Sequence, residues 1–508
     1  MQNKSRTLVN NSVALFVRML IRTGINLYTM RVILQVLGVE DYGIYNVVAG
    51  FVLMFGFINS TMSGAMSRFF SYNLGQEDFN SLQRSFRASL TIQIIVSFGI
   101  ILITETIGLI IVNHLLVIPT NRIIAANIVY QSAILGMIFT FLQVPYNAMI
   151  IAYERMNIYA VIEILNALLL LLIVYVIEVL PYDKLIAYSV FYVIIYFSTL
   201  CLYAVYCIKK IRICDFKINL RRQDIIPLLS FSGWDLFSNV GQSAQVQANS
   251  VVVNVFWGSI LNASIGIANH IYSAILMFAY SVTTAVRPQI IKAYASQDTH
   301  QMIQLTRESS KYIMLISTAL CVPLIVEMDF ILKIWLGEVP KMAVEFAQII
   351  LINHSLCASK SVLIIPIHAT GDIKFFSISM GLMYLMAIPF AYLLAMFGFS
   401  PIIVFGVIIV LSIGNVVLEL HFLNSHFCGF NINEYIAKLM IPNSILLTTC
   451  IFFGYLIKGL FHYTFLNLVI ILICISVVTL FLGYYLLLDK KSKIFLKSFI
   501  KNLFGKPE

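Results

Sequence analysis

Long apolar runs separated by short polar breaks dominate the chain. The sequence contains fourteen runs of about 20 or more residues, each long enough to cross a bilayer as a helix. Such runs are too long and too apolar for barrel strands, so we predict an all-α integral membrane protein. The expected helices cover 8–35, 43–67, 87–113, 123–150, 157–180, 185–208, 224–256, 261–286, 312–335, 343–368, 375–397, 401–424, 436–457 and 464–488.

The composition agrees with this class. Only 11% of the 508 residues are charged, whereas about a quarter are charged in soluble proteins, so polar surface is too scarce for a water-facing body. Eight cysteines lie in or beside apolar segments without a CxxC pair, which indicates neither a metal site nor a disulfide framework. The first apolar segment carries Arg18 and Arg22 and lacks the features of a cleavable signal peptide.

Positive charge is concentrated on one side of the expected membrane. Of the 33 Lys and Arg residues, 23 fall in loops on one side and five on the other, which predicts that both termini are cytoplasmic. Basic clusters at 209–222 and 490–506 would lie beside the anionic lipids of the inner leaflet. They explain the net charge of +10 without a nucleic-acid partner.

An apolar segment recurs 223 residues later in the same frame. The stretch GIYNVVAGFVLMFGFINSTM starts at Gly43, GIANHIYSAILMFAYSVTTA starts at Gly266, and seven of nineteen aligned positions are identical. We predict two six-helix lobes, 1–223 and 224–430, followed by two further helices and a basic tail in 431–508. Parallel repeats of this kind enclose a substrate site between two lobes related by an axis along the membrane normal. A duplication that only builds a scaffold is the alternative.

The first helix carries charges where lipid is expected. Its residues Asn11, Arg18, Arg22, Asn26 and Thr29 are spaced by 7, 4, 4 and 3 positions, which places them on one helical face. A guanidinium near mid-bilayer costs roughly 2.5–3.5 kcal/mol, so this face should line a wet interior rather than meet lipid. There the planar fork of arginine suits phosphate.

The repeat aligns Arg18 with Gly241 and Arg22 with Gln245. Because the second half lacks both arginines, we interpret them as substrate-binding rather than fold-forming. Two alternatives stay open: Arg18 snorkels to the interface, and Arg22 pairs with an acid in a neighbouring helix.

Polar residues in other spans are further candidates. Lys360 lies in the tenth span, where it either contacts pyrophosphate or sugar or belongs to a buried pair. Glu105, Glu163 and Asp235 are the acids expected inside the membrane, as arginine partners, as ion-coupling carboxylates or as cavity-lining groups. The seventh helix has a polar face that we expect to line the cavity, formed by Asp235, Asn239, Gln242, Gln245 and Asn249.

Two turns carry a family resemblance. VLGVEDYGIYN at 36–46 and HATGDIK at 368–374, with the helix layout, resemble the polysaccharide-exporter branch of the MOP superfamily, which flips O-antigen, capsule and exopolysaccharide repeat units. The resemblance implies translocation of an undecaprenyl-pyrophosphate-linked oligosaccharide across the bacterial inner membrane by alternating access. It implies no cofactor, and the expected partners are that lipid-linked sugar, membrane lipids and other polysaccharide-assembly proteins.

Three other classes compete with this interpretation. A MATE-like exporter of cationic drugs shares the architecture, but unpaired intramembrane arginines argue against a cationic cargo. A membrane enzyme such as a ligase or polymerase would need a large external loop or a catalytic constellation, and the sequence has neither. The arginines also disfavour a scaffold. No GxxxxGK[ST] loop is present, so energy would come from a gradient or from downstream consumption.

Overall fold

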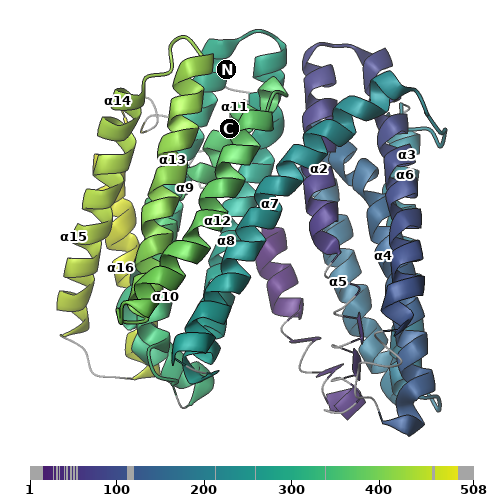
Figure 1. Ribbon diagram of the computed structural model, residues 1–508, viewed down its shortest axis with the longest axis horizontal. Coiled ribbons are helices and arrows are strands. Elements are labelled where there is room, and N and C mark those ends of the chain that lie inside the picture. The colour runs from purple at the N-terminus through teal and green to yellow at the C-terminus, as the bar shows by residue number, and fades with distance from the viewer. Residues whose placement is uncertain are drawn as a thin grey trace, which may run out of the picture. The chain divides into compact units, whose positions relative to one another are not determined.

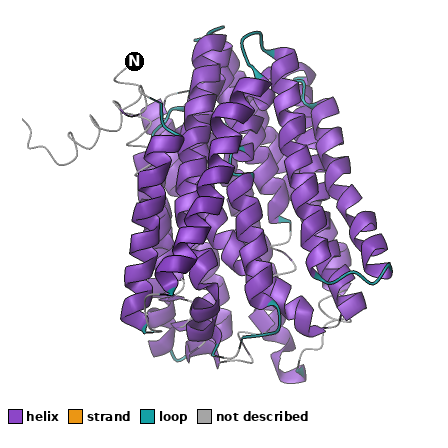
Figure 2. Cartoon of the chain, turned by 90° about the vertical axis from the view of Figure 1, so that its left-hand side faces the viewer, coloured by secondary structure: helices purple, strands orange, loops and turns teal. Residues whose placement is uncertain are grey.

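Every described segment of regular structure is helical (Figures 1 and 2), which confirms the predicted all-α class. Within the described residues, ten helices are long and apolar enough to cross a membrane, and one bent pair makes an eleventh. The chain is a multi-pass membrane protein. The computed structural model describes residues 15, 17–26, 28–29, 32–33, 35–38, 41, 44–45, 48–49, 52, 55–110, 119–211, 213–257, 259–337, 339–459, 464–489 and 493.

The chain divides into two compact units, Met1–Leu236 and Phe237–Glu508. Unit 1 is built around α4, which is apolar on all sides and packs against α2, α3, α5 and α6. Residues 15–38 are helical wherever they are described. The remaining helices of this unit are α2 (Gly56–Gly75), α3 (Phe79–Ile103), α4 (Ile123–Ala152), α5 (Met156–Val179), α6 (Lys184–Ile211) and the first part of α7 (Arg222–Trp257).

Unit 2 is built around α9, which packs against α8, α10, α15 and α16. The boundary between the two units falls within α7. The predicted division of the chain into lobes 1–223 and 224–430 and a segment 431–508 stays a prediction. The helices of unit 2 are the rest of α7, α8 (Ser259–Ala295), α9 (Thr299–Leu336), α10 (Ala343–Leu356), α11 (Lys360–Thr370), α12 (Lys374–Met396), α13 (Ile402–His426), α14 (Ile432–Tyr435), α15 (Ile441–Lys458) and α16 (Phe465–Leu486).

Each unit contains the same three-residue turn, at 76–78 and at 296–298. Glu77 and Gln297 adopt left-handed backbone angles, with φ of 57° and 61°. The aspartate that ends each turn accepts a hydrogen bond from the backbone N–H three residues later, at 2.9 and 2.8 Å. These caps start α3 and α9 earlier than predicted, so the expected starts at residues 87 and 312 are wrong. The two turns are 220 positions apart, three fewer than the offset of the sequence repeat, and a left-handed residue, Glu154, also follows the end of α4, so the predicted repeat stays a prediction.

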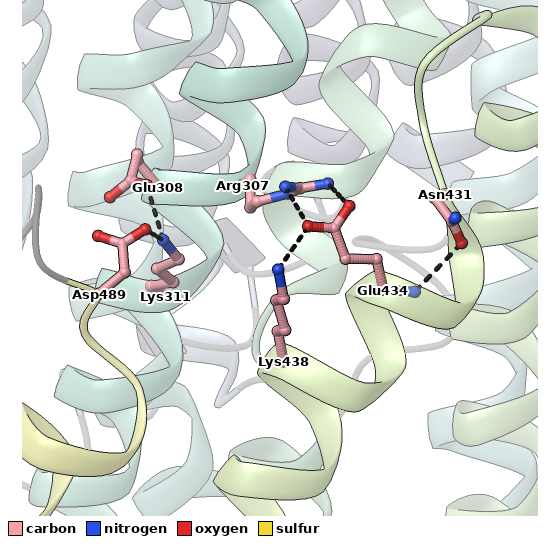
Figure 3. A network of polar contacts seen from close by, with 7 residues as sticks. All are labelled: Arg307, Glu308, Lys311, Asn431, Glu434, Lys438 and Asp489. Carbon is pink, nitrogen blue, oxygen red and sulfur yellow. Dashed lines mark hydrogen bonds and ion pairs between the residues drawn. The ribbon is translucent and has the colours of Figure 1, made fainter.

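Charged networks tie helix ends together in unit 2 (Figure 3). Arg307 of α9 donates two hydrogen bonds to Glu434 of α14, at 3.0 and 2.9 Å. Lys311 bonds to Glu308 at 2.7 Å and to Asp489 at 2.9 Å. Bidentate pairing fixes orientation as well as distance, so these contacts hold α14 and the segment after α16 to α9.

The predicted tenth span, 343–368, is broken. It consists of α10 and α11, bent by 47°. Next to the bend, Asn443 of α15 donates to the carbonyl of Ser355 at 2.9 Å, and its own oxygen accepts from Thr318 of α9 at 3.1 Å. The hydroxyls of Thr318 and Ser355 are 2.8 Å apart. Because this buried network supplies partners to the polar groups at the bend, it stabilises the break.

Candidate functional site

In unit 1, Arg22 of the first helix forms an ion pair with Glu163 of α5. The other oxygen of this carboxylate accepts a hydrogen bond from the hydroxyl of Tyr203 of α6, at 3.0 Å. Glu163 and Tyr203 are buried, whereas 38% of the Arg22 side chain is exposed. Both oxygens of Glu163 are therefore satisfied, and the alternative of a pairing acid for Arg22 is the arrangement that the structure shows.

Arg18 lies one helical turn before Arg22 and differs from it. Only 7% of Arg18 is exposed, and its guanidinium lies over the ring of Tyr159, 4.9 Å from the centroid. Its Nε has no hydrogen-bond partner, and among the described residues no carboxylate pairs with it. A buried guanidinium that rests on an aromatic face keeps its donors available for an anion.

The other predicted residues of the first helix are less informative. Asn11 lies outside the described residues. Asn26 is exposed. The hydroxyl of Thr29 donates to the carbonyl of Ile25 at 2.7 Å, so it is satisfied within its own helix.

Gly241, which the repeat aligns with Arg18, has a packing role. A Cβ atom at Gly241 would approach the carbonyl oxygen of Gly381 to 2.9 Å and its Cα to 3.1 Å, so α7 and α12 touch there through their backbones. The twin of Arg22, Gln245, is buried. The absence of an arginine at position 241 thus has a physical reason of its own. Arg18 is therefore a candidate for anion binding because of its own surroundings, and the difference between the repeats adds nothing to this.

The polar face predicted on α7 is only partly buried, and it crosses the boundary between the units. Asp235 in unit 1 and Gln245 and Asn249 in unit 2 are buried, Asn239 is half-buried, and Gln242 is exposed. The side-chain oxygen of Asn249 has no hydrogen-bond partner among the described residues.

Glu105 is half-buried in the π-helical turn Thr104–Gly108, which continues α3. It accepts a hydrogen bond from Gln131 of α4 at 3.2 Å. Its predicted role in ion coupling stays a prediction.

Unit 2 contains a second charged cluster. Lys360, the first residue of α11, donates a hydrogen bond to the hydroxyl of Tyr384 of α12, and its ammonium lies 4.5 Å from the centroid of that ring. Glu419 lies on α13, which packs against α11, and it is completely buried. Neither carboxylate oxygen of Glu419 has a hydrogen-bond partner among the described residues. Whether Lys360 contacts pyrophosphate or sugar or belongs to a buried pair stays a prediction.

Sequence reasoning missed Glu419. It lies in the apolar stretch IIVLSIGNVVLELHF, which suggests a lipid-facing span. The available signal was the spacing of Asn415 and Glu419, four residues apart on one helical face. Asn415 is also buried, and its side-chain oxygen likewise lacks a partner within the described part of the chain.

The fold matches solved transporters of the MOP superfamily. A MATE protein in its bent conformation aligns with a TM-score of 0.69 and 14% identity, over 82% of this chain and 93% of that chain. An outward-facing multidrug resistance MATE family transporter gives 0.67 and 14%, over 82% and 94%. A MOP superfamily transporter from Pyrococcus furiosus, described as having a binding pocket of reverse polarity that suggests a different function, gives 0.66 and 15%, over 82% and 94%.

At these identities the likeness establishes the fold alone. No protein-family model matches the sequence, and no curated protein sequence matches it.

Proposed function

We propose that this protein translocates a polyprenyl-pyrophosphate-linked oligosaccharide across the bacterial inner membrane by alternating access. The observation that carries the proposal is Arg18, a buried guanidinium without a carboxylate partner among the described residues. Burying an unpaired charge is costly, and such a charge is retained where a ligand of opposite sign offsets the cost. A pyrophosphate that enters the membrane with its lipid is a ligand of that kind.

Arg22 supports this role indirectly. Its pair with Glu163 neutralises the only acid seen next to the two arginines in the described structure, so the local charge on the first helix remains positive. An anionic headgroup fits this balance, whereas a cationic cargo would be repelled.

The alternative cargo is a small molecule or drug exchanged by a MATE-like antiporter. It is favoured by the fold itself, which this chain shares with the multidrug resistance transporter described above. The charge of the cargo separates the two functions.

The test uses the purified full chain in proteoliposomes loaded with a labelled polyprenyl-pyrophosphate oligosaccharide, and measures the label that becomes accessible to an impermeant glycosidase. We expect Arg18→Gln to slow translocation roughly 10- to 100-fold, because a charge-assisted hydrogen bond contributes about 1.5–3 kcal/mol. The matched control is Arg84→Gln, which removes a guanidinium whose side chain is 41% exposed. Equal rates for wild type and a folded Arg18→Gln variant contradict the proposal. Transport of organic cations without flipping of the lipid supports the antiporter.

A further inference from the structure

The cluster of Lys360, Tyr384 and Glu419 contains buried acceptors without donors. Both oxygens of Glu419 and the side-chain oxygen of Asn415 are buried, and none of the three has a hydrogen-bond partner among the described residues. An ionised carboxylate in that position is expensive, because it has lost water and gained no hydrogen bond. It is relieved by binding a proton or by pairing with a cation.

The cation available to Glu419 is the ammonium of Lys360. Lys360 lies within electrostatic range of Glu419 but gives its hydrogen bond to Tyr384 instead. Lys360 is half-buried as a residue, whereas Glu419 is completely buried. Three further titratable side chains lie within electrostatic range of Lys360 or Glu419: Tyr272 of α8, Cys357 at the bend and Tyr435 of α14.

A metal ion fits this cluster poorly. The ammonium of Lys360 would repel a cation beside Glu419. In the described part of the chain, no three His, Cys, Asp or Glu side chains converge in a way that would hold a metal. A proton neutralises Glu419 without that repulsion.

We infer that Glu419 is a proton-binding residue whose protonation leaves Lys360 free to bind a phosphate-type anion. In one state a proton from water binds a Glu419 oxygen and Lys360 rests on Tyr384, as observed. In the other state the proton has returned to water, and the carboxylate takes Lys360 as its partner. The anion-binding part of this inference rests on the proposed function.

The two ligands therefore assist each other. A proton on Glu419 raises the affinity of Lys360 for an anion, and by reciprocity a bound anion raises the affinity of Glu419 for a proton. Proton and anionic cargo bind together, which is the opposite of an exchange in which a proton displaces a cation.

The first experiment is calorimetric binding of inorganic pyrophosphate to the detergent-solubilised full chain, over a series of pH values. Buffers with different ionisation enthalpies report the protons taken up. Wild type should take up protons on binding over part of the pH range. Glu419→Gln should still bind pyrophosphate, but it should not take up the proton that wild type takes up on Glu419. Lys360→Gln should bind about tenfold more weakly and lose the same uptake. Glu345→Gln, which changes an exposed carboxyl on α10, is the control and should retain it.

Proton uptake by Glu419→Gln equal to that of wild type overturns the inference. So does unchanged binding by Lys360→Gln, or a failure of wild type to bind pyrophosphate at all. Infrared difference spectroscopy tests the proton separately. Wild type should show a carboxylic-acid carbonyl band that is missing from Glu419→Gln, and its absence from wild type overturns the proton site. Translocation that depends on Arg18 reports on the proposed function independently of both results.

Discussion

Each unit contains a cluster of a basic residue, a tyrosine and a glutamate. The two clusters differ in whether the carboxylate oxygens of the glutamate have hydrogen-bond partners. Unit 1 joins Arg22, Glu163 and Tyr203, and both oxygens of the carboxylate are bonded. Unit 2 places Lys360 with Tyr384, while the oxygens of Glu419 have no partner among the described residues. A satisfied pair stabilises one packing of helices, whereas an unsatisfied group favours a change of protonation or partner. The comparison assigns a structural role to the first cluster and a switching role to the second.

Removing the acid of unit 1 should have the largest effect on stability. Glu163→Gln leaves Arg22 without its counter-charge, and we expect a loss of about 2 kcal/mol, below the range for fully buried pairs because 38% of the Arg22 side chain is exposed. Thermal unfolding in detergent measures the change. The exchange Arg22→Glu with Glu163→Arg should restore part of the stability, and an unaltered melting temperature in Glu163→Gln would refute a structural pair.

The two tyrosines should differ in the next measurement. Tyr203→Phe removes a donor to a buried carboxylate and should cost about 1 kcal/mol or more. Tyr384→Phe should cost less, because its partner Lys360 is half-buried as a residue, whereas the partner of Tyr203 is a buried carboxylate. Chemical denaturation of both variants gives the difference, and a larger loss for Tyr384→Phe would reverse the assignment of roles.

Asp215, in the segment between α6 and α7, offers a smaller effect that depends on pH. Hydrogen bonds from Arg87 lower the pKa of Asp215 below its usual value. The stability from this pair is therefore fully present above the usual pKa of aspartate and is lost as the pH falls through the lowered pKa. Asp215→Asn should cost about 0.5 kcal/mol at neutral pH and nothing in strong acid. A cost that persists after acidification would contradict this origin.

Glu419→Gln should have the smallest effect on stability. An amide of the same shape replaces a carboxyl that has no observed hydrogen bond, so the change should stay within about 0.5 kcal/mol or stabilise the protein. Measuring the melting temperature of Glu419→Gln beside that of Glu163→Gln gives the difference in stability between the two substitutions directly. A loss as large as that in unit 1 would show that Glu419 has a structural partner.

Much of the fold followed from local patterns, because long apolar runs and basic loops are visible in sequence. The bend between α10 and α11 was missed because its support comes from Asn443, 88 residues away from Ser355. Sequence offered Glu105, Glu163 and Asp235 as partners for the arginines but did not decide among them, since Glu163 lies 141 residues further along than Arg22. Glu419 was missed because its neighbours in the sequence are apolar, so that the stretch resembles a lipid-facing span. Gly241 shows the converse error, because a packing contact explains a difference between repeats that had suggested a substrate role.

The charge selectivity of translocation tests the central claim most directly. Proteoliposomes containing the full chain are supplied with one oligosaccharide on two carriers, a polyprenyl pyrophosphate and a neutral lipid of equal length, and the two flipping rates are compared. Wild type should favour the pyrophosphate carrier by at least about tenfold, and Arg18→Gln should bring the ratio close to one. A wild-type ratio near one, or a ratio unchanged in Arg18→Gln, would contradict an anion-binding role for Arg18.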